Sequence, residues 1–247
     1  MKKHMGIPER EERFNAVSVK DFSRTNSIWN EGHFNSVSRA GKVFDKIKRA
    51  NQEYQCDADY AFSGPVMPLS YWEDYYFSQV KTEEEIIRLA EGFHDNCHSS
   101  GIELTPRQAL CFTLYRIIDQ TYDGLVSEML AFLLLQASLP DLELAVSGDR
   151  YDRRYGVDFV GKRDGRVVRA FQQKPERFFT AVERYCKHGS PVWVRSSANA
   201  HYKANKAFEK DCSVPVEYIS LHSDGAGSVE LVNHGPFITI MAKRNTK

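Results

Sequence analysis

The first half of the chain is organised by apolar side chains that recur at helical spacing. Thr82 opens one such segment with a capping-box pattern, Thr-Glu-Glu-Glu, and Gly101 is expected to end it. Thr105 opens a second segment in the same way, and Asp123-Gly124 is expected to end it. An earlier helix is predicted over residues 40–54. These patterns predict a mainly helical N-terminal region.

After residue 124 the pattern changes to shorter apolar runs. A mostly apolar helix is predicted over residues 125–138, and further helices over residues 176–188 and 198–210. Runs typical of strands occupy residues 142–147, 157–162, 166–174, 191–196, 214–221, 228–233 and 237–243. This order of helices and strands indicates an α/β fold with a mixed sheet. We therefore predict two regions, residues 1–124 and a core over residues 125–247.

Composition narrows the class of protein. Hydrophobic residues make up 42% and charged residues 27% of the 247 positions, which are ordinary globular values. The formal net charge is +0, so contact with nucleic acid would have to come from a local basic patch. Five cysteines without regular spacing fit a reducing compartment better than a disulfide framework. The charged N-terminus has no following apolar run, and the most apolar stretch, residues 125–139, is too short to span a bilayer. A cytoplasmic protein without membrane spans is expected.

Two of the predicted strands carry polar residues where a core strand is normally apolar. Asp158 lies in one of them, and Gln172 and Lys174 end the next. The turn between the two strands decides which of their side chains share a face. A two-residue turn at Asp164-Gly165 would place Asp158 on the face of Phe171. A three-residue turn with a left-handed glycine would place Asp158 on the face of Gln172 and Lys174. We expect the three-residue turn, because only that turn brings the three polar side chains together.

A carboxylate, an amide oxygen and an ammonium group at the edge of a sheet suit metal-assisted hydrolysis of a phosphodiester. Asp158 would bind a hard divalent cation such as Mg²⁺ through oxygen, and the carbonyl oxygen of Gln172 could join it. Lys174 could orient or help deprotonate the attacking water, or neutralise charge on the phosphate. Each residue also has a structural interpretation. Asp158 could bond nearby backbone or arginine, and Gln172 and Lys174 could form the solvated end of a strand.

The order of the polar residues resembles that of the PD-(D/E)XK nuclease superfamily: Glu128 in a helix, Gly-Val-Asp at 156–158, then Gln172-x-Lys174 after a hairpin. The glutamine-bearing branch is most similar, as in Mrr-like restriction nucleases and the cutting subunit of some transposons. The resemblance covers about residues 125–210. The chain departs from the family pattern in having Gly-Val-Asp in place of Pro-Asp and glutamine in place of the second acid.

The resemblance implies a restriction-endonuclease-like mixed β-sheet flanked by helices. It implies that Asp158 and Gln172 bind the metal ion, that Lys174 is the catalytic lysine and that Glu128 adds a carboxylate to the metal shell. For Glu128 there is an alternative interpretation. It could sit in the first turn of its helix, where the backbone dipole favours a carboxylate.

Basic residues gather around the same strands. Nine lie between Ser147 and Arg177, against five acidic residues, and Tyr151 and Tyr155 interleave with the arginines. Such a patch can position a phosphate backbone. The residues expected to contact DNA are Arg150, Arg153, Arg154, Arg163 and Arg166. For any single arginine, an ion pair in a solvated loop is the alternative.

Together these features predict an Mg²⁺-dependent DNA endonuclease. The expected form is a site-specific type II restriction enzyme that acts on double-stranded DNA as a homodimer, with residues 1–124 supplying sequence recognition, a dimer surface or both. One alternative is a DNA-binding or assembly protein on a nuclease fold that no longer cuts. Another is a nuclease subunit of a larger complex such as a transposition machine. A zinc site at His94, Cys97 and His98 with Cys111 is a weaker candidate, because no second ligand motif accompanies it.

Overall fold

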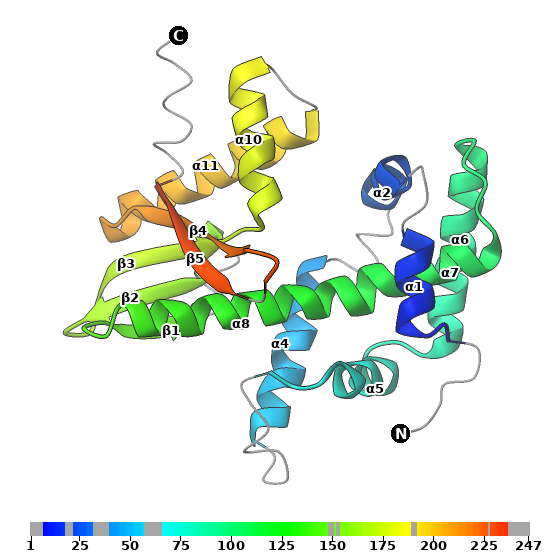
Figure 1. The fold of residues 1–247 in the computed structure, drawn as a ribbon, viewed down its shortest axis with the longest axis horizontal. Coiled ribbons are helices and arrows are strands. Elements are labelled where there is room, and N and C mark those ends of the chain that lie inside the picture. The colour runs from blue at the N-terminus through cyan, green and yellow to red at the C-terminus, as the bar shows by residue number, and fades with distance from the viewer. Residues whose placement is uncertain are drawn as a thin grey trace. The chain divides into compact units, whose positions relative to one another are not determined.

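The fold is mixed α/β, with a helical first part and a five-stranded mixed sheet in the second. The computed structural model describes residues 7–17, 22–31, 40–56, 66–147, 151, 154–188, 192–226 and 228–236. The chain divides into two units, Met1–Val126 and Ser127–Lys247. Figure 1 labels the helices and strands of both units. Within the described ranges, no helix is long and apolar enough to cross a membrane.

The first unit is built from helices that pack through aromatic side chains. Trp29 meets the ring of Phe93 edge-on, with 5.1 Å between centroids, and Phe93 stacks on Phe112 at 5.0 Å. All three rings are buried. The helices of this unit include α1 (Arg10–Val17), α2 (Phe22–Glu31), α4 (Ala40–Cys56), α5 (Leu69–Gln79), α6 (Glu83–Ser99) and α7 (Pro106–Leu114). The range of α4 confirms the helix predicted over residues 40–54.

The helix starts predicted from the capping boxes are confirmed. Thr82 Oγ1 accepts a hydrogen bond from Glu85 N, and Glu85 Oε2 accepts one from Thr82 N, at the start of α6. Thr105 and Gln108 form the same reciprocal pair at the start of α7. Gly101 follows the end of α6 with a left-handed φ of +72°, which favours glycine at a helix C-terminus.

The helix end predicted at Asp123-Gly124 is wrong. The chain of α7 continues through a π-helical segment, Tyr115–Asp119, directly into α8 (Gln120–Ser138). Asp123 lies inside this helix and accepts a hydrogen bond from Arg10 at 3.1 Å. A glycine inside a helix costs only about 1 kcal/mol, which the burial of apolar side chains near it, such as Ile118 and Leu125, outweighs.

A buried ion-pair network joins the π-helical segment to α1 and α5. Arg13 of α1 is 2% exposed and donates to both carboxylate oxygens of Asp119, at 2.7 and 3.0 Å. It also donates to Glu73 of α5 at 2.7 Å. Removing one partner of such a network would leave an uncompensated buried charge, so the three side chains fix the packing of these helices together.

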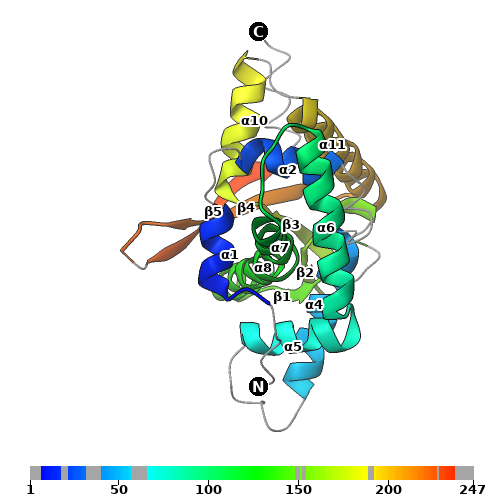
Figure 2. The same ribbon diagram turned by 90° about the vertical axis from the view of Figure 1, so that its right-hand side faces the viewer.

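The second unit contains a five-stranded sheet in the order β1-β2-β3-β4-β5. The strand β3 pairs antiparallel with β2 and parallel with β4, and the two outer pairs are antiparallel. Figure 2 shows β4 and β5 side by side. The strands are β1 (Glu143–Val146), β2 (Phe159–Arg163), β3 (Arg166–Gln173), β4 (Val216–Ser223) and β5 (Val229–Pro236). Two helices, α10 (Glu176–His188) and α11 (Val192–Cys212), carry the chain from β3 to the parallel β4.

The two faces of the sheet are covered by different helices, as Figure 1 shows. Phe159 and Phe171 belong to a buried cluster with side chains of α8. Val160, Ala170 and Tyr218 belong to a second buried cluster with side chains of α10 and α11. Adjacent residues of β2 and of β3 therefore point to opposite faces, as strand geometry requires.

Five of the predicted strands are confirmed as β1 to β5, but the strand predicted over residues 191–196 is wrong. That segment leads into α11, which begins at Val192. Residues 192–196 instead belong to this helix, which with α10 connects β3 to the parallel β4. Strand propensity is a local signal that packing overrides. The strand predicted over residues 237–243 lies outside the described residues.

The turn between β2 and β3 differs from the predicted three-residue turn. Asp164 and Gly165 both have positive φ, 52° and 73°, and Arg163 pairs with Arg166 across them. Two central residues with positive φ form the type I′ turn, whose twist matches that of a hairpin. The expected three-residue turn is therefore wrong, because the two-residue turn already gives a hairpin of the right hand.

A register shift between Gly161 and Lys162 lies on β2 just before this turn. Beyond the shift, Val160 pairs with Ala170, and both side chains belong to the cluster under α10 and α11. Gln172, two residues after Ala170, points to the same face by the alternation of a strand. The bulge thus aligns the side chains of β2 and β3 as the three-residue turn would have done, by a different route.

We expect the cluster under α8 to hold the central strands in place. Phe171 is fully buried, whereas Val168 on the same strand is 40% exposed. Phe171→Ala should lower the free energy of unfolding by about 3–5 kcal/mol. Val168→Ala, the control, should change it by no more than about 0.5 kcal/mol. Urea denaturation followed by circular dichroism measures both, and similar values for the two variants would contradict this description of the sheet.

Candidate functional site

The carboxylate of Asp158 anchors the end of β3. Asp158 N donates to Phe171 O at 2.9 Å, and Asp158 Oδ2 accepts from the backbone N–H of Gln173 at 2.7 Å. The carboxylate therefore serves as the acceptor for this N–H of β3. This bond to the backbone is the structural role considered for Asp158, and it uses one of the two carboxylate oxygens, Oδ2. It also fixes the half-buried side chain beside the strand end.

Gln172 is buried beside this anchor. Its side chain is 2% exposed, and its neighbour across the parallel pair is Tyr218. Gln172 Oε1 has no hydrogen-bond partner among the residues that the structure describes. Leaving a buried acceptor unsatisfied costs about 1–3 kcal/mol, so such an atom indicates a place for a cation or an ordered water. A solvated strand end does not describe this residue.

Two residues beside Gln172 and Lys174 could not be identified from the sequence. Tyr218 of β4 is fully buried, and burial together with the negative charge of Asp158 raises its pKa. Asp158 precedes Phe159, which points to the face under α8, so strand alternation places Asp158 on the face under α10 and α11. His201 of α11 contacts the Tyr218 ring with 6.2 Å between centroids. Both residues lie outside any motif, and only the packing of α11 on β4 brings them to the strand end.

Lys174 directly follows β3 and lies near His201. Its N–H donates to Ile219 O at 2.9 Å, which continues the parallel pairing with β4 by one residue. Burial, and secondly the positive charge of Lys174, lower the pKa of His201 to about 4. His201 is therefore a neutral imidazole at neutral pH. The imidazole therefore adds no second positive charge beside Lys174 at neutral pH.

Glu128 lies on the side of α8 that faces the sheet. It is 6% exposed and stands three residues before Ala131, which packs in the cluster with Phe159 and Phe171. The preceding residue, Ser127, accepts a hydrogen bond from Gln173 Nε2 at 3.0 Å through its hydroxyl oxygen. The helix thus carries Glu128 to the end of the sheet where β3 finishes.

The alternative interpretation of Glu128 is wrong. A carboxylate in the first turn of a helix would interact with unsatisfied backbone N–H groups. The helix α8 begins at Gln120, well before Glu128, and continues the helical chain of α7. The dipole of a helix start therefore does not account for this buried carboxylate.

The arginines expected to contact DNA fall into two groups. Arg150 and Arg153 lie outside the described residues, and Arg154 pairs with Asp211 at 3.4 Å. Arg163 and Arg166 are exposed at the hairpin turn, at the opposite end of β3 from Gln172. Six residues of strand separate Arg166 from Gln172, or roughly 20 Å. For Arg154, the alternative of an ion pair in place of a DNA contact is therefore the one that the structure shows.

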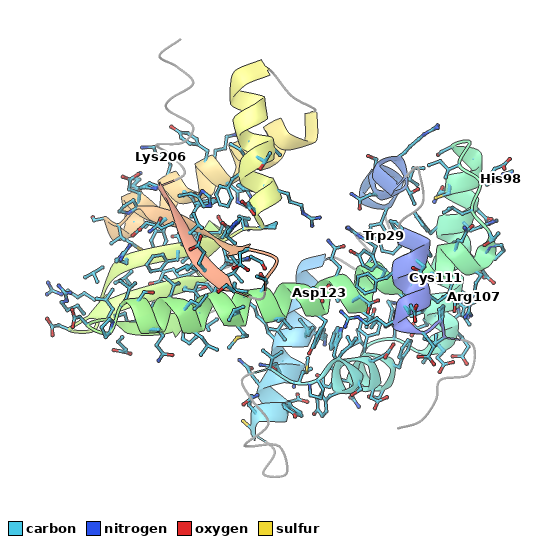
Figure 3. All side chains as sticks on the ribbon, in the orientation of Figure 1. Trp29, His98, Arg107, Cys111, Asp123 and Lys206 are labelled. Carbon is cyan, nitrogen blue, oxygen red and sulfur yellow. The ribbon has the colours of Figure 1, made fainter. Side chains whose placement is uncertain are left out.

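The zinc site considered at His94, Cys97, His98 and Cys111 is not assembled. Cys97 and Cys111 are buried thiols, and burial raises the pKa of each to about 11. Cys111 Sγ donates to Glu12 Oε1, while His98 is exposed. Figure 3 shows His98 near the end of α6, away from Cys111 on α7. Within the described ranges, no group of three or more His, Cys, Asp or Glu residues could hold a metal ion.

A second group of polar side chains lies at one end of the sheet and includes two carboxylates and an amide oxygen. Asp158, Gln172 and Lys174 gather at one end of the sheet, and α8 brings Glu128 to the same end. Hard oxygen ligands next to an ammonium group suit a divalent cation and a phosphate. No protein-family model, curated protein sequence or solved structure matches the chain. The chemistry of this site is therefore argued from its own residues.

The anchor formed by Asp158 generates a prediction about stability. Asp158→Ala leaves the Gln173 N–H without its acceptor and should lower the free energy of unfolding by about 1–3 kcal/mol. Asp158→Asn keeps an oxygen acceptor and should cost about 1 kcal/mol less than the alanine variant. Urea denaturation of both variants measures the difference. An equal loss would show that the charge, rather than the acceptor, holds the strand end.

The neutral state of His201 generates a prediction about pH. Its folded-state pKa lies below the ordinary value of 6.5, so the unfolded chain takes up the proton first as pH falls. The contribution of His201 to stability should therefore be complete above pH 6.5 and should diminish between pH 6.5 and pH 4. His201→Phe, which keeps a ring against Tyr218, should reduce this loss. The test compares the unfolding midpoints of the wild type and of His201→Phe at about pH 7 and about pH 4.5. If the two proteins lose the same stability between these pH values, the prediction for His201 is wrong.

Proposed function

We propose that the protein is an Mg²⁺-dependent endonuclease that hydrolyses phosphodiester bonds of double-stranded DNA. The observation that carries this proposal is the buried Oε1 of Gln172, an acceptor without a donor among the described residues. Gln172 directly precedes Gln173, whose N–H Asp158 accepts, and stands two residues before Lys174. The mixed sheet covered by helices on both faces supports a restriction-endonuclease-like fold for residues 125–247.

The side chains at the strand end fit Mg²⁺, which binds oxygen ligands and keeps several waters. Asp158 would contribute a carboxylate oxygen, Gln172 its Oε1, and Glu128 a carboxylate from α8. Two of these three ligands are anionic, so the set would balance the charge of one divalent cation. When bound, Mg²⁺ supplies Lewis-acid polarisation of the phosphate and lowers the pKa of a bound water.

Lys174 would stabilise the charge that develops on the phosphate. Its ammonium group lies near the neutral His201, so no cationic imidazole competes with it at neutral pH. The backbone of Lys174 is fixed by its hydrogen bond to Ile219, which limits how far the side chain can move from the strand end. A positioned ammonium can hold the scissile phosphate or the attacking water, and positioning is a large part of such catalysis.

Arg163 and Arg166 would bind the DNA backbone away from the cut. They lie roughly 20 Å from Gln172, which corresponds to about six base pairs along a duplex. Contacts to phosphates position the enzyme without reading sequence. Sequence recognition, a dimer surface or both would come from residues 1–124. The site-specific type II restriction enzyme acting as a homodimer is the form that unites these roles.

The neutral Gln172 favours a second candidate function. An amide in place of a second acid lowers the negative charge at the metal, as expected for a DNA-binding or assembly protein on a nuclease fold that no longer cuts. A nuclease subunit of a larger complex, such as a transposition machine, would cut only with its partners. Incubation of the pure protein with plasmid DNA and Mg²⁺ separates these functions by its outcome: discrete fragments, no cleavage, or cleavage only after partners are added.

Lys174 gives the sharpest test of the chemistry. Lys174→Ala should lower the cleavage rate by about two to three orders of magnitude, because charge stabilisation and positioning are lost together. DNA affinity should change little, since one lysine is a small part of a phosphate-contacting surface. Lys174→Arg should not restore the rate, because a planar guanidinium does not replace a compact ammonium. Cleavage rate and affinity are measured on the same folded samples.

Lys203→Ala provides the matched control, because Lys203 is exposed on α11. It should cut at the wild-type rate. Cleavage by Lys174→Ala at that rate would remove Lys174 from the chemistry. Full wild-type activity in excess chelator would exclude the metal-dependent mechanism.

A further inference from the structure

Gly156 lies against the carboxamide of Gln172. A Cβ atom built on Gly156 would stand 2.8 Å from Gln172 Nε2, 3.5 Å from its Cδ and 3.6 Å from its Oε1. Contacts below 3.0 Å are essentially never seen for real Cβ atoms. Gly156 also has a φ of +63°, in the left-handed region that favours glycine. Two separate constraints therefore act on this position, its backbone conformation and the proximity of one side chain.

The close approach determines where the amide of Gln172 lies. With Nε2 against the backbone of Gly156, the amide plane brings Oε1 to the buried place that holds no donor among the described residues. Gln172 is 2% exposed, so its amide is enclosed rather than free to swing into solvent. A methyl group at residue 156 would be accommodated by moving the end of this side chain, and Oε1 would move with it.

We propose that Gly156 is a positioning residue for the metal ion, which acts by letting Gln172 present Oε1 as a ligand. The proposal rests on the proposed function. It also gives a physical reason for the Gly-Val-Asp sequence at 156–158. The glycine makes room for a glutamine amide and lets the chain turn into Asp158, so Gly156 and Gln172 work as a pair. A side chain at 156 would press first on the neutral ligand, because the three atoms nearest to its Cβ all belong to Gln172.

The test compares two glycines that share the left-handed conformation. Gly165 has a φ of +73° and nothing within 4 Å of a Cβ built on it, so Gly165→Ala carries the backbone strain alone. Gly156→Ala carries the strain and the displacement of Gln172. Mn²⁺ serves as the probe, with affinity measured by electron paramagnetic resonance and melting temperature measured without metal. Gly156→Ala should weaken Mn²⁺ binding by about tenfold, as loss of a group that orients a ligand does. Gly165→Ala should bind Mn²⁺ as the wild type does.

A double variant shows whether Gly156 acts through Gln172. In a Gln172→Ala background the side chain in question is gone, so Gly156→Ala should produce no further loss of Mn²⁺ affinity. The double variant should melt below Gln172→Ala by the same number of degrees by which Gly165→Ala melts below the wild type. If Gly156→Ala alone does not fold, recovery of folding in the double variant supports the pairing, and continued failure overturns it.

The outcomes separate the two proposals. A wild-type protein without saturable Mn²⁺ binding overturns the proposed function and this inference with it. Wild-type binding that Gly156→Ala leaves unchanged overturns this inference alone. An equal loss of affinity in the presence and absence of the Gln172 side chain also overturns it, because Gly156 would then act by another route.

Discussion

The hydrogen bond from the Gln173 N–H to the carboxylate of Asp158 is the interaction on which the rest of the site depends. An interior strand needs an acceptor for each N–H group along both edges. On one edge β4 provides it, as at Lys174, whose N–H donates to Ile219. On the other edge the side chain of Asp158 provides it for Gln173. The strand end is therefore bonded on both sides, and Gln172 and Lys174 project from a fixed backbone.

This end of the sheet combines strong packing with a polar conflict. Phe159 and Phe171 fill one face, while Val160 and Ala170 fill the other. Between these apolar residues and Lys174 stands Gln172, a buried amide with an unsatisfied oxygen. A sheet selected only for stability would carry an apolar side chain there. Violations of the local rules for folding concentrate at functional sites, where packing elsewhere compensates for their cost.

The sequence predicted those parts of the fold whose cause is local. Both capping boxes involve residues three apart, and the hydrophobic pattern of residues 166–174 reflects the pleat of one strand. The predictions failed for segments whose structure depends on contacts with residues far away in the sequence. The helix passes through Gly124 because side chains of α8 beyond it pack on the sheet. Residues 192–196 lie in α11, which with α10 connects β3 to the parallel β4. His201 and Tyr218 carried no local signal, because they meet the site only through the packing of α11 on β4.

The charge distribution restricts how such a protein could hold DNA. Arg169 is bound to Glu217 through two hydrogen bonds at 2.7 and 2.5 Å, and Arg154 pairs with Asp211, so the basic residues counted along the chain are not all available to phosphates. The net charge of +0 adds no general attraction. Affinity that comes from phosphate contacts grows with their number. A single chain that contacts DNA mainly at Arg163 and Arg166 would bind weakly, whereas two copies related by symmetry would double the contacts on one duplex. If Arg163 and Arg166 are the main contacts, as proposed, DNA binding by a homodimer would rest on this doubling of contacts rather than on the net charge.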